Sequence, residues 1–194
     1  MTITQDTTDF PGTTGFPETA DFPKAADARE TAEPVAYRAL LGLLDAVSVP
    51  YRLIDHAPEG RTDLASALRG HELAAAAKCM VVALHHRDRE TRHVVAVVPG
   101  DSRVDLKALR RLYGAADARL APAEVAEDLS GCVVGTIMPF SFDPRLGVVA
   151  DPRLLDAEHL YFNAARLDRS VELRAGDYAA TAAPRFAPIA KDAS

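Results

Sequence analysis

AAAAKCMVVAL (residues 74–84) places one ammonium group, Lys78, between a run of alanines and an apolar strand. Burial of a lysine without a partner costs several kcal/mol. Lys78 therefore either extends its charge to solvent or a counterion, or serves a ligand. A second apolar stretch, HVVAVVPG (residues 93–100), follows the charged segment HHRDRETR. Two apolar strands with a charged connection predict a β-hairpin whose turn is solvated.

The segments around this hairpin alternate between strand and helix patterns without a strict βαβ rhythm. Further apolar strands are expected at residues 51–55, 147–151, 160–164 and 170–175. Helices are expected from Val35 to before Pro50, at 62–70, 105–114 and 122–131, and around 177–183, with Thr62 and Asp105 as N-caps. The pattern predicts the α+β class, with one mixed α/β domain over residues 34–186.

The charge of the chain is concentrated at its N-terminus. Residues 1–33 hold seven acids and two bases, a net −5, whereas the whole chain of 194 residues has a net charge of −6. The remainder is therefore near neutral, at −1. A near-neutral domain lacks the basic face that binds DNA or RNA without sequence preference, so we expect no DNA partner. A local basic groove for one RNA end is compatible with this balance.

The two ends of the chain are predicted to lie outside the domain. Residues 1–33 are rich in Thr, Pro and Asp and are expected to form a disordered tail, and residues 187–194 a short C-terminal tail. Phe10, Phe16 and Phe22 each precede a proline, so the alternative is a linear motif that docks on a partner. The start MTITQDTTDF does not resemble a secretory signal, and no run of eighteen apolar residues exists. We therefore expect a cytoplasmic protein that does not enter a membrane.

Several common catalytic patterns are absent. The sequence has no P-loop, no GxGxxG after a strand, no GxSxG and no HExxH. His85, His86 and His93 flank the hairpin turn, where a solvated surface is favoured over a metal-dependent hydrolase. Cys79 and Cys132 stand in apolar stretches and are interpreted as small buried hydrophobes rather than a disulfide, with a catalytic thiol as the alternative. We expect neither a metal nor another cofactor.

A looser set of polar groups lies at the ends of the expected strands. His56 follows the strand at 51–55, Asp151 ends the strand at 147–151, and Asn163 lies near the end of the next. The segment GTIMP adds Gly135, which lets the backbone approach a ligand, and Pro139, which fixes the turn. Polar groups on the loops of a rigid sheet are common in binding sites. The alternative for Asp151 is a cap or turn residue.

The order of these motifs resembles the YbaK/ProX family of aminoacyl-tRNA deacylases, related to the editing domain of bacterial prolyl-tRNA synthetases. The resemblance covers residues 35–178 and rests on the strand-opening lysine, the PGD before a D-L-K helix, and the GxxxP turn. The motifs that carry it are YRLIDHAP, TDLASALRG, AAAKCMVVAL, VVAVVPGDSRVDLKALRRLYG, LSGCVVGTIMPFSF and VVADPRLL.

The resemblance implies a fold and an activity. The fold is a single domain with a central, mostly antiparallel, barrel-like sheet flanked by helices. The activity is metal-free hydrolysis of the ester that joins a wrong amino acid to the 3′ end of tRNA, with a synthetase as a further partner. The implied catalytic residues are Lys78 and Gly135. The implied substrate contacts are His56, Thr62, Thr136, Pro139, Asp151 and Asn163.

The sequence departs from the family pattern at three positions. Thr136 stands where a second glycine is common, Met138 where Ser or Thr precedes the proline, and Ala165 near a usual glycine. A β-carbon narrows the space beside the backbone and disfavours positive φ. Either the pocket is tuned to a small amino acid, or the protein is a catalytically lapsed module that binds a tRNA end or a synthetase.

Overall fold

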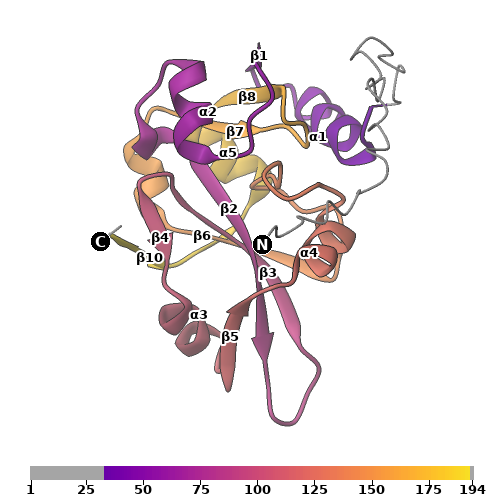
Figure 1. Ribbon diagram of the computed structural model, residues 1–194, viewed down its shortest axis with the longest axis vertical. Coiled ribbons are helices and arrows are strands. Elements are labelled where there is room, and N and C mark those ends of the chain that lie inside the picture. Colours follow the sequence, from indigo (N-terminus) through magenta and orange to yellow (C-terminus); the bar gives the residue numbers. More distant parts are fainter. Residues whose placement is uncertain (1–32, 193–194) are drawn as a thin grey trace, which may run out of the picture. The chain divides into compact units, whose positions relative to one another are not determined.

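A computed structural model describes residues 33–192. The expected N-terminal tail, with its Phe-Pro units, lies outside these residues except for Glu33. The described chain forms three sheets, with strand orders β5-β2-β3-β6-β9, β1-β8-β7 and β10-β4 (Figure 1). The mixed α/β class is thus confirmed, but these sheets remain separate in the described residues and form no closed barrel.

The expected hairpin is the centre of the largest sheet. β2 (Ala77–His85) pairs antiparallel with β3 (Arg92–Pro99), in a register that sets Lys78 opposite Val98. The sheet is completed by β5 (Asp117–Leu120) beside β2, and by β6 (Leu146–Ala150) and β9 (Arg185–Phe186) beyond β3. Pairing among the described strands is antiparallel except for the β3–β6 and β6–β9 pairs.

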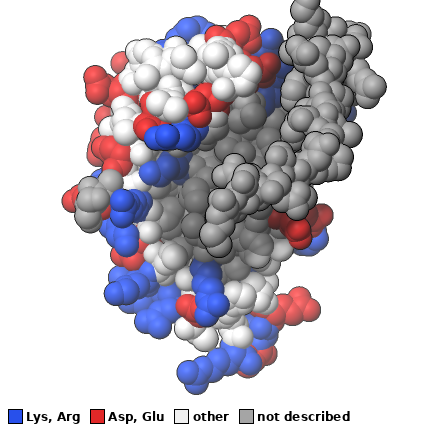
Figure 2. All heavy atoms as spheres, in the orientation of Figure 1, with Lys and Arg blue, Asp and Glu red and all other residues white. Residues whose placement is uncertain are grey.

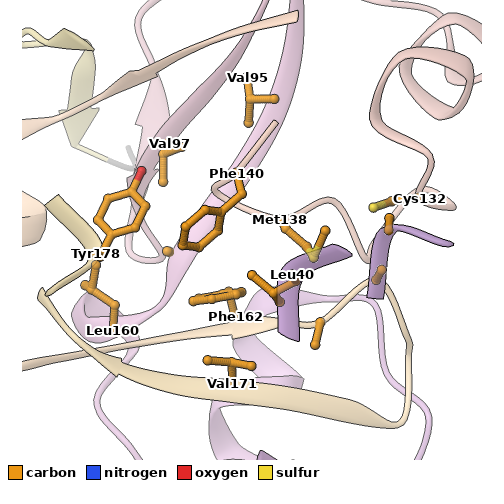
Figure 3. Packing of buried hydrophobic residues seen from close by; sticks show 14 of the residues in the cluster. Leu40, Val95, Val97, Cys132, Met138, Phe140, Leu160, Phe162, Val171 and Tyr178 are labelled. Atoms are coloured by element: carbon orange, nitrogen blue, oxygen red, sulfur yellow. The ribbon is translucent and has the colours of Figure 1, made fainter. Parts of the chain in front are cut away.

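The apolar strands β2 and β3 are buried on both faces. Val81, Val95 and Val97 face one cluster, whereas Val82 and Val94 face another. The first cluster is the larger and includes Phe140, Phe162 and Tyr178 (Figure 3). A strand buried on both faces is a continuous apolar run rather than an alternation, which is why these two stretches stood out in the sequence.

The second sheet covers the larger cluster. Its strands are β1 (Tyr51–Asp55), β8 (Arg169–Arg174) and β7 (His159–Asn163), all antiparallel. The helices α1 (Val35–Ala46) and α5 (Ala175–Ala182) contribute Leu40 and Tyr178 to the same cluster. The remaining helices are α2 (Thr62–Arg69), η1 (Leu73–Ala75), α3 (Leu106–Tyr113), α4 (Ala123–Ser130) and η2 (Pro152–Asp156). No helix among the described residues is long and apolar enough to cross a membrane.

Several helix ends follow local sequence signals. The Asp105 carboxylate accepts from the N–H groups of Lys107 and Ala108, so the predicted cap is confirmed. Gly70 and Gly114 end their helices in the left-handed conformation. Thr62 is the first residue of α2 and not its cap, which is Arg61. The N-cap prediction for Thr62 was therefore wrong by one residue.

Residues 187–192 pack against the domain, whereas residues 187–194 were expected to form a C-terminal tail. β10 (Ala190–Asp192) pairs antiparallel with β4 (Ser102–Val104). Ala187 and Ile189 are buried in the second cluster. The physical reason is that these apolar side chains complete a core that the sheet alone leaves open on that side.

Candidate functional site

A pocket of about 560 Å³ opens at the edge of β2. β5 pairs with β2 only from Val82 onward, so the first half of β2 has no strand neighbour on that side. The pocket occupies this open edge, and its other walls are α2, the end of β7, the loop at residues 134–137, and the segment from the end of β5 into α4. Lys78, Thr62, Gly135 and Asn163 all line it, so the structure brings together four of the predicted site residues.

Lys78 is held at the rim by backbone carbonyls. Its ammonium group donates to the oxygen of Gly100, at 2.9 Å, and to that of Ser102. The side chain is half-buried, and this burial lowers its pKa, while the nearby Asp101 carboxylate acts in the opposite direction. An ammonium group has three N–H donors, and the two carbonyls use two of them. The third remains for a ligand in the pocket.

The loop at residues 134–137, which lines the same pocket as Lys78, depends on two glycines in backbone contact. Gly135 has a φ of 91°, which side-chain-bearing residues rarely adopt. A Cβ atom there would lie 2.9 Å from the Gly60 Cα atom. The close approach of these two chain segments therefore requires glycine at position 135.

Two backbone donors of this loop are unused. Within the described residues, no hydrogen bond uses the N–H group of Gly135 or of Ile137. Both residues line the pocket. Free N–H groups beside a cavity can stabilise negative charge that develops on a bound oxygen.

Asn163 ties the two glycine loops together. Its side-chain amide donates to the Glu59 oxygen at 2.8 Å and to the Gly135 oxygen at 3.0 Å. Its own oxygen accepts from the Ser170 hydroxyl at 3.0 Å. Asn163 is only 8% exposed. The main contacts of this predicted substrate residue are thus with the protein backbone.

Arg69 is a pocket residue that sequence reasoning missed. Its guanidinium donates to the Ser170 hydroxyl at 3.0 Å, and its Nε atom is buried without a hydrogen-bond partner. Burial lowers its pKa. The available signal was helical spacing, because Thr62, Ala65 and Arg69 share one face of α2 and all line the pocket.

Four predicted substrate residues do not line the pocket. His56 lies behind it, with Nε2 2.7 Å from the Ser170 hydroxyl. Thr136 is fully buried, and its hydroxyl donates to the Val133 oxygen at 2.9 Å. Pro139 is buried in the segment that enters the core. The fourth is Asp151.

Asp151 joins the C-terminal segment to the sheet. It is 2% exposed, and its carboxylate accepts from the N–H groups of Ile189, Ala190 and Arg153 at 2.8, 2.7 and 3.0 Å. All three partners are backbone groups, and the pocket residues include none of them. In place of the expected substrate contact, the structure gives Asp151 the cap role that was the alternative.

The histidines and cysteines around the hairpin show no catalytic arrangement. No group of three or more His, Cys, Asp or Glu side chains in residues 33–192 is placed to hold a metal ion. Both thiols are free, and burial raises the pKa of Cys79 and raises that of Cys132 to about 11. A raised pKa disfavours the nucleophilic thiolate.

The fold and pocket together define a class: a small α+β domain whose ligand site lies at an open sheet edge, between a held lysine and a glycine loop. The chain belongs to the aminoacyl-tRNA editing domain family, whose family model matches residues 57–181. The resemblance seen in the sequence is thereby confirmed.

Relatives agree with this assignment. The chain is 38% identical over 154 residues to the multifunctional Ser/Thr-tRNA deacylase ProXp-y of Escherichia coli (strain K12), covering 78% of this chain and 91% of that protein. The fold is similar to that of the hypothetical protein APE2540, with a TM-score of 0.71 and 23% identity over 78% of this chain and 99% of the other. It is also similar to a putative trans-editing enzyme for prolyl tRNA synthetase, with a TM-score of 0.69 and 19% identity over 81% and 98% of the two chains.

Proposed function

We propose that this protein is a hydrolase that clears mischarged tRNA by cleaving the ester between the amino acid and the tRNA 3′ end. The observation that carries the proposal is the pocket, inside the segment that matches the editing family, which is lined both by Lys78 and by a loop with unused N–H groups. Water adds to the ester carbonyl and the bond to the ribose oxygen breaks. The ribose oxygen leaves with a proton, giving free amino acid and uncharged tRNA.

Each pocket group has a part in this reaction. The remaining N–H of Lys78 binds an oxygen of the terminal nucleotide or of the aminoacyl group. The N–H groups of Gly135 and Ile137 stabilise the oxyanion that forms when water adds. Asn163 holds the loop in place through the Gly135 carbonyl. An activated ester needs little beyond positioning and such donors, so the reaction requires no metal.

Thr136 and Ala165, which replace or lie near glycines of the family pattern, leave the pocket open. Thr136 turns its hydroxyl back onto Val133 and does not line the pocket. Ala165 keeps the left-handed conformation, with a φ of 55°. These observations favour an active enzyme over the lapsed binding module.

For the substrate, we propose serine or threonine as the amino acid removed. The support is the relative in Escherichia coli, whose name gives it as a Ser/Thr-tRNA deacylase. A small pocket separates amino acids that differ by a methylene or a hydroxyl only modestly, so several small residues are expected to be cleared. We further propose that the protein acts in the cytoplasm, where charged tRNA is used, and that a synthetase is a partner.

A deacylation screen tests the proposal. Purified full-length protein is incubated with tRNAs charged with Ser, Thr, Ala, Cys or Pro, and the loss of aminoacyl-tRNA is followed against a protein-free reaction. Release of Ser or Thr above the spontaneous rate is the expected result. Binding of these tRNAs without hydrolysis of any of them would instead establish the lapsed module. Undiminished activity in the presence of EDTA would exclude a metal-dependent reaction.

A further inference from the structure

The Ser170 hydroxyl lies at the centre of a hydrogen-bond network beside the pocket. Ser170 belongs to β8 and is fully buried, and three side chains approach its oxygen. The distances are 3.0 Å to Arg69 Nη1, 2.7 Å to His56 Nε2 and 3.0 Å to Asn163 Oδ1. A hydroxyl donates one proton and accepts its other bonds. Only one of the three partners can therefore receive the Ser170 proton.

Two of these partners have fixed roles. The Arg69 guanidinium can only donate. The side-chain nitrogen of Asn163 donates to two backbone carbonyls, so the orientation of the amide is set and its oxygen points to Ser170. That oxygen can only accept. Asn163 therefore needs the Ser170 proton, and His56 is the one competitor for it in this network.

The protonation state of His56 decides which partner receives the proton. Its Nδ1 atom lies 2.8 Å from the Ala57 carbonyl oxygen, which can only accept, so Nδ1 carries a proton. In the neutral ring, Nε2 is then bare and accepts from Ser170. In the charged ring, Nε2 also donates, and the hydroxyl proton turns to Asn163. The contacts of the network are satisfied together only when His56 is charged.

Charged groups of both signs lie around His56. Figure 2 shows acidic and basic side chains intermixed at the top of the view, where Figure 1 places β1, β8 and α2. Arg69 faces His56 across the Ser170 hydroxyl, and its charge opposes a second proton on the imidazole. His56 itself is partly exposed, so its protonation follows the pH of the solvent. The acids of the flanking segments are engaged elsewhere: Asp55 pairs with Arg169, Asp168 with Arg166, and Glu59 accepts from the Arg61 N–H group.

We propose that His56 is a positioning residue whose charged form orders the loop at residues 134–137. The inference rests on the proposed function, and the effect passes through Ser170 and Asn163. Asn163 donates to the Gly135 carbonyl at 3.0 Å, and a bond accepted by its own oxygen strengthens that donor. When neutral His56 takes the hydroxyl proton, the Asn163 oxygen keeps only a contact of 3.5 Å with Arg69 within this network. The loop with the unused N–H groups is then held less firmly.

A pH profile distinguishes this positioning role from a purely structural one. Single-turnover deacylation of the best substrate of the screen is measured between about pH 5 and 8, where histidine titrates, for wild type, Ser170→Ala and His56→Gln. The control, His85→Gln, removes an exposed histidine of the β2–β3 hairpin. The ratio of the wild-type rate to that of each test variant should fall about threefold to tenfold as the pH rises, which corresponds to the loss of one hydrogen bond. The ratio of wild type to control should stay constant.

NMR locates the protons without turnover. The ring nitrogens of His56, assigned by the loss of their signals in His56→Gln, should carry a proton on Nδ1 alone at high pH and on both atoms at low pH. The side-chain amide of Asn163 and the backbone N–H group of Gly135 should shift with the same midpoint. This shift should disappear in Ser170→Ala.

Three results overturn the proposal. They are a constant ratio of wild-type to variant rates, a neutral His56 ring protonated on Nε2, and Asn163 signals that do not follow the titration of His56. A protein that hydrolyses no aminoacyl-tRNA but shows the coupled NMR titration would defeat the proposed function, and it would leave the control of the loop by His56 established.

Discussion

Lys78 and Asp151 are charged side chains at strand ends that were both expected in the site, yet the structure uses them differently. Asp151 is buried, and its carboxylate accepts from the backbone N–H groups of Ile189 and Ala190 in the C-terminal segment and of Arg153 in η2. Lys78 is half-buried against two carbonyls and keeps one donor toward a pocket. A charge whose hydrogen bonds are all used within the protein stabilises the fold, whereas one with a donor left beside a cavity can serve a ligand.

The largest effect is expected for Lys78→Ala. Loss of a positioned cationic donor should lower the deacylation rate about a hundredfold to a thousandfold. The free energy of unfolding should change by no more than about 1 kcal/mol, because only two hydrogen bonds at a half-exposed rim are lost. Single-turnover deacylation and urea denaturation measure the two quantities. Lys78→Met, which keeps most of the aliphatic stem, should be equally inactive, and a Met variant with wild-type activity would contradict the role of the charge.

Asp151→Ala is expected to lower stability while leaving the deacylation rate almost unchanged, the opposite of Lys78→Ala. Three buried or part-buried N–H groups lose their acceptor, so the free energy of unfolding should fall by about 3 kcal/mol. The rate per folded molecule should stay within about twofold of wild type, because no partner of this carboxylate lines the pocket. Asp151→Asn, which keeps one acceptor oxygen, should lose less stability. If Asp151→Ala instead lowered the deacylation rate as much as Lys78→Ala does and kept wild-type stability, Asp151 would belong to the substrate site.

The β2–β3 hairpin and the helix cap at Asp105 illustrate what local sequence can predict. β2 and β3 are continuous apolar runs, and Asp105 stands directly before a helical pattern, so each is determined by its own neighbours. The position of Lys78 at the start of a strand could likewise be predicted from the sequence, and the family resemblance implied its catalytic role.

Other features depend on tertiary contacts that local patterns do not carry. The short strands β4, β5 and β10 have too few residues for a periodicity, and a cross-strand partner defines each of them. The sequence did not show that Arg69 lines the pocket or that Asn163 joins two loops, because Arg69 bonds Ser170, and Asn163 bonds the Glu59 carbonyl, across about 100 residues of chain. For Asp151 the sequence left two interpretations open, because an acid after a strand has the same sequence signature in a cap as in a site.

The pH dependence of the deacylation rate and of stability tests whether the charge of Lys78 is used. Burial lowers its pKa below the ordinary lysine value. If the ammonium form is the active one, deacylation should fall as the pH rises through this lowered pKa, after subtraction of spontaneous hydrolysis. Stability should move the other way: between the folded and unfolded pKa values the unfolded chain binds more protons, so the free energy of unfolding rises with pH. Both trends should be absent in Lys78→Met, and a pH-independent rate in wild type would show that the charge of Lys78 is not used.

The smallest effect is expected for Ala165→Gly, which separates backbone strain from catalysis. Ala165 has a φ of 55°, a conformation that costs a side-chain-bearing residue about 1 to 2 kcal/mol. Replacement by glycine removes that strain. It also removes the methyl group of a residue that is 4% exposed, and it raises the entropy of the unfolded chain. Because these effects oppose each other, the free energy of unfolding should change by less than about 1 kcal/mol. The deacylation rate should remain within about twofold of wild type, because Ala165 does not line the pocket. Thermal denaturation and the rate on the best substrate of the screen provide the measurement. A large gain in rate would mean that the missing glycine had impaired the enzyme, and Lys78 would then stand in a site that only partly retains its chemistry.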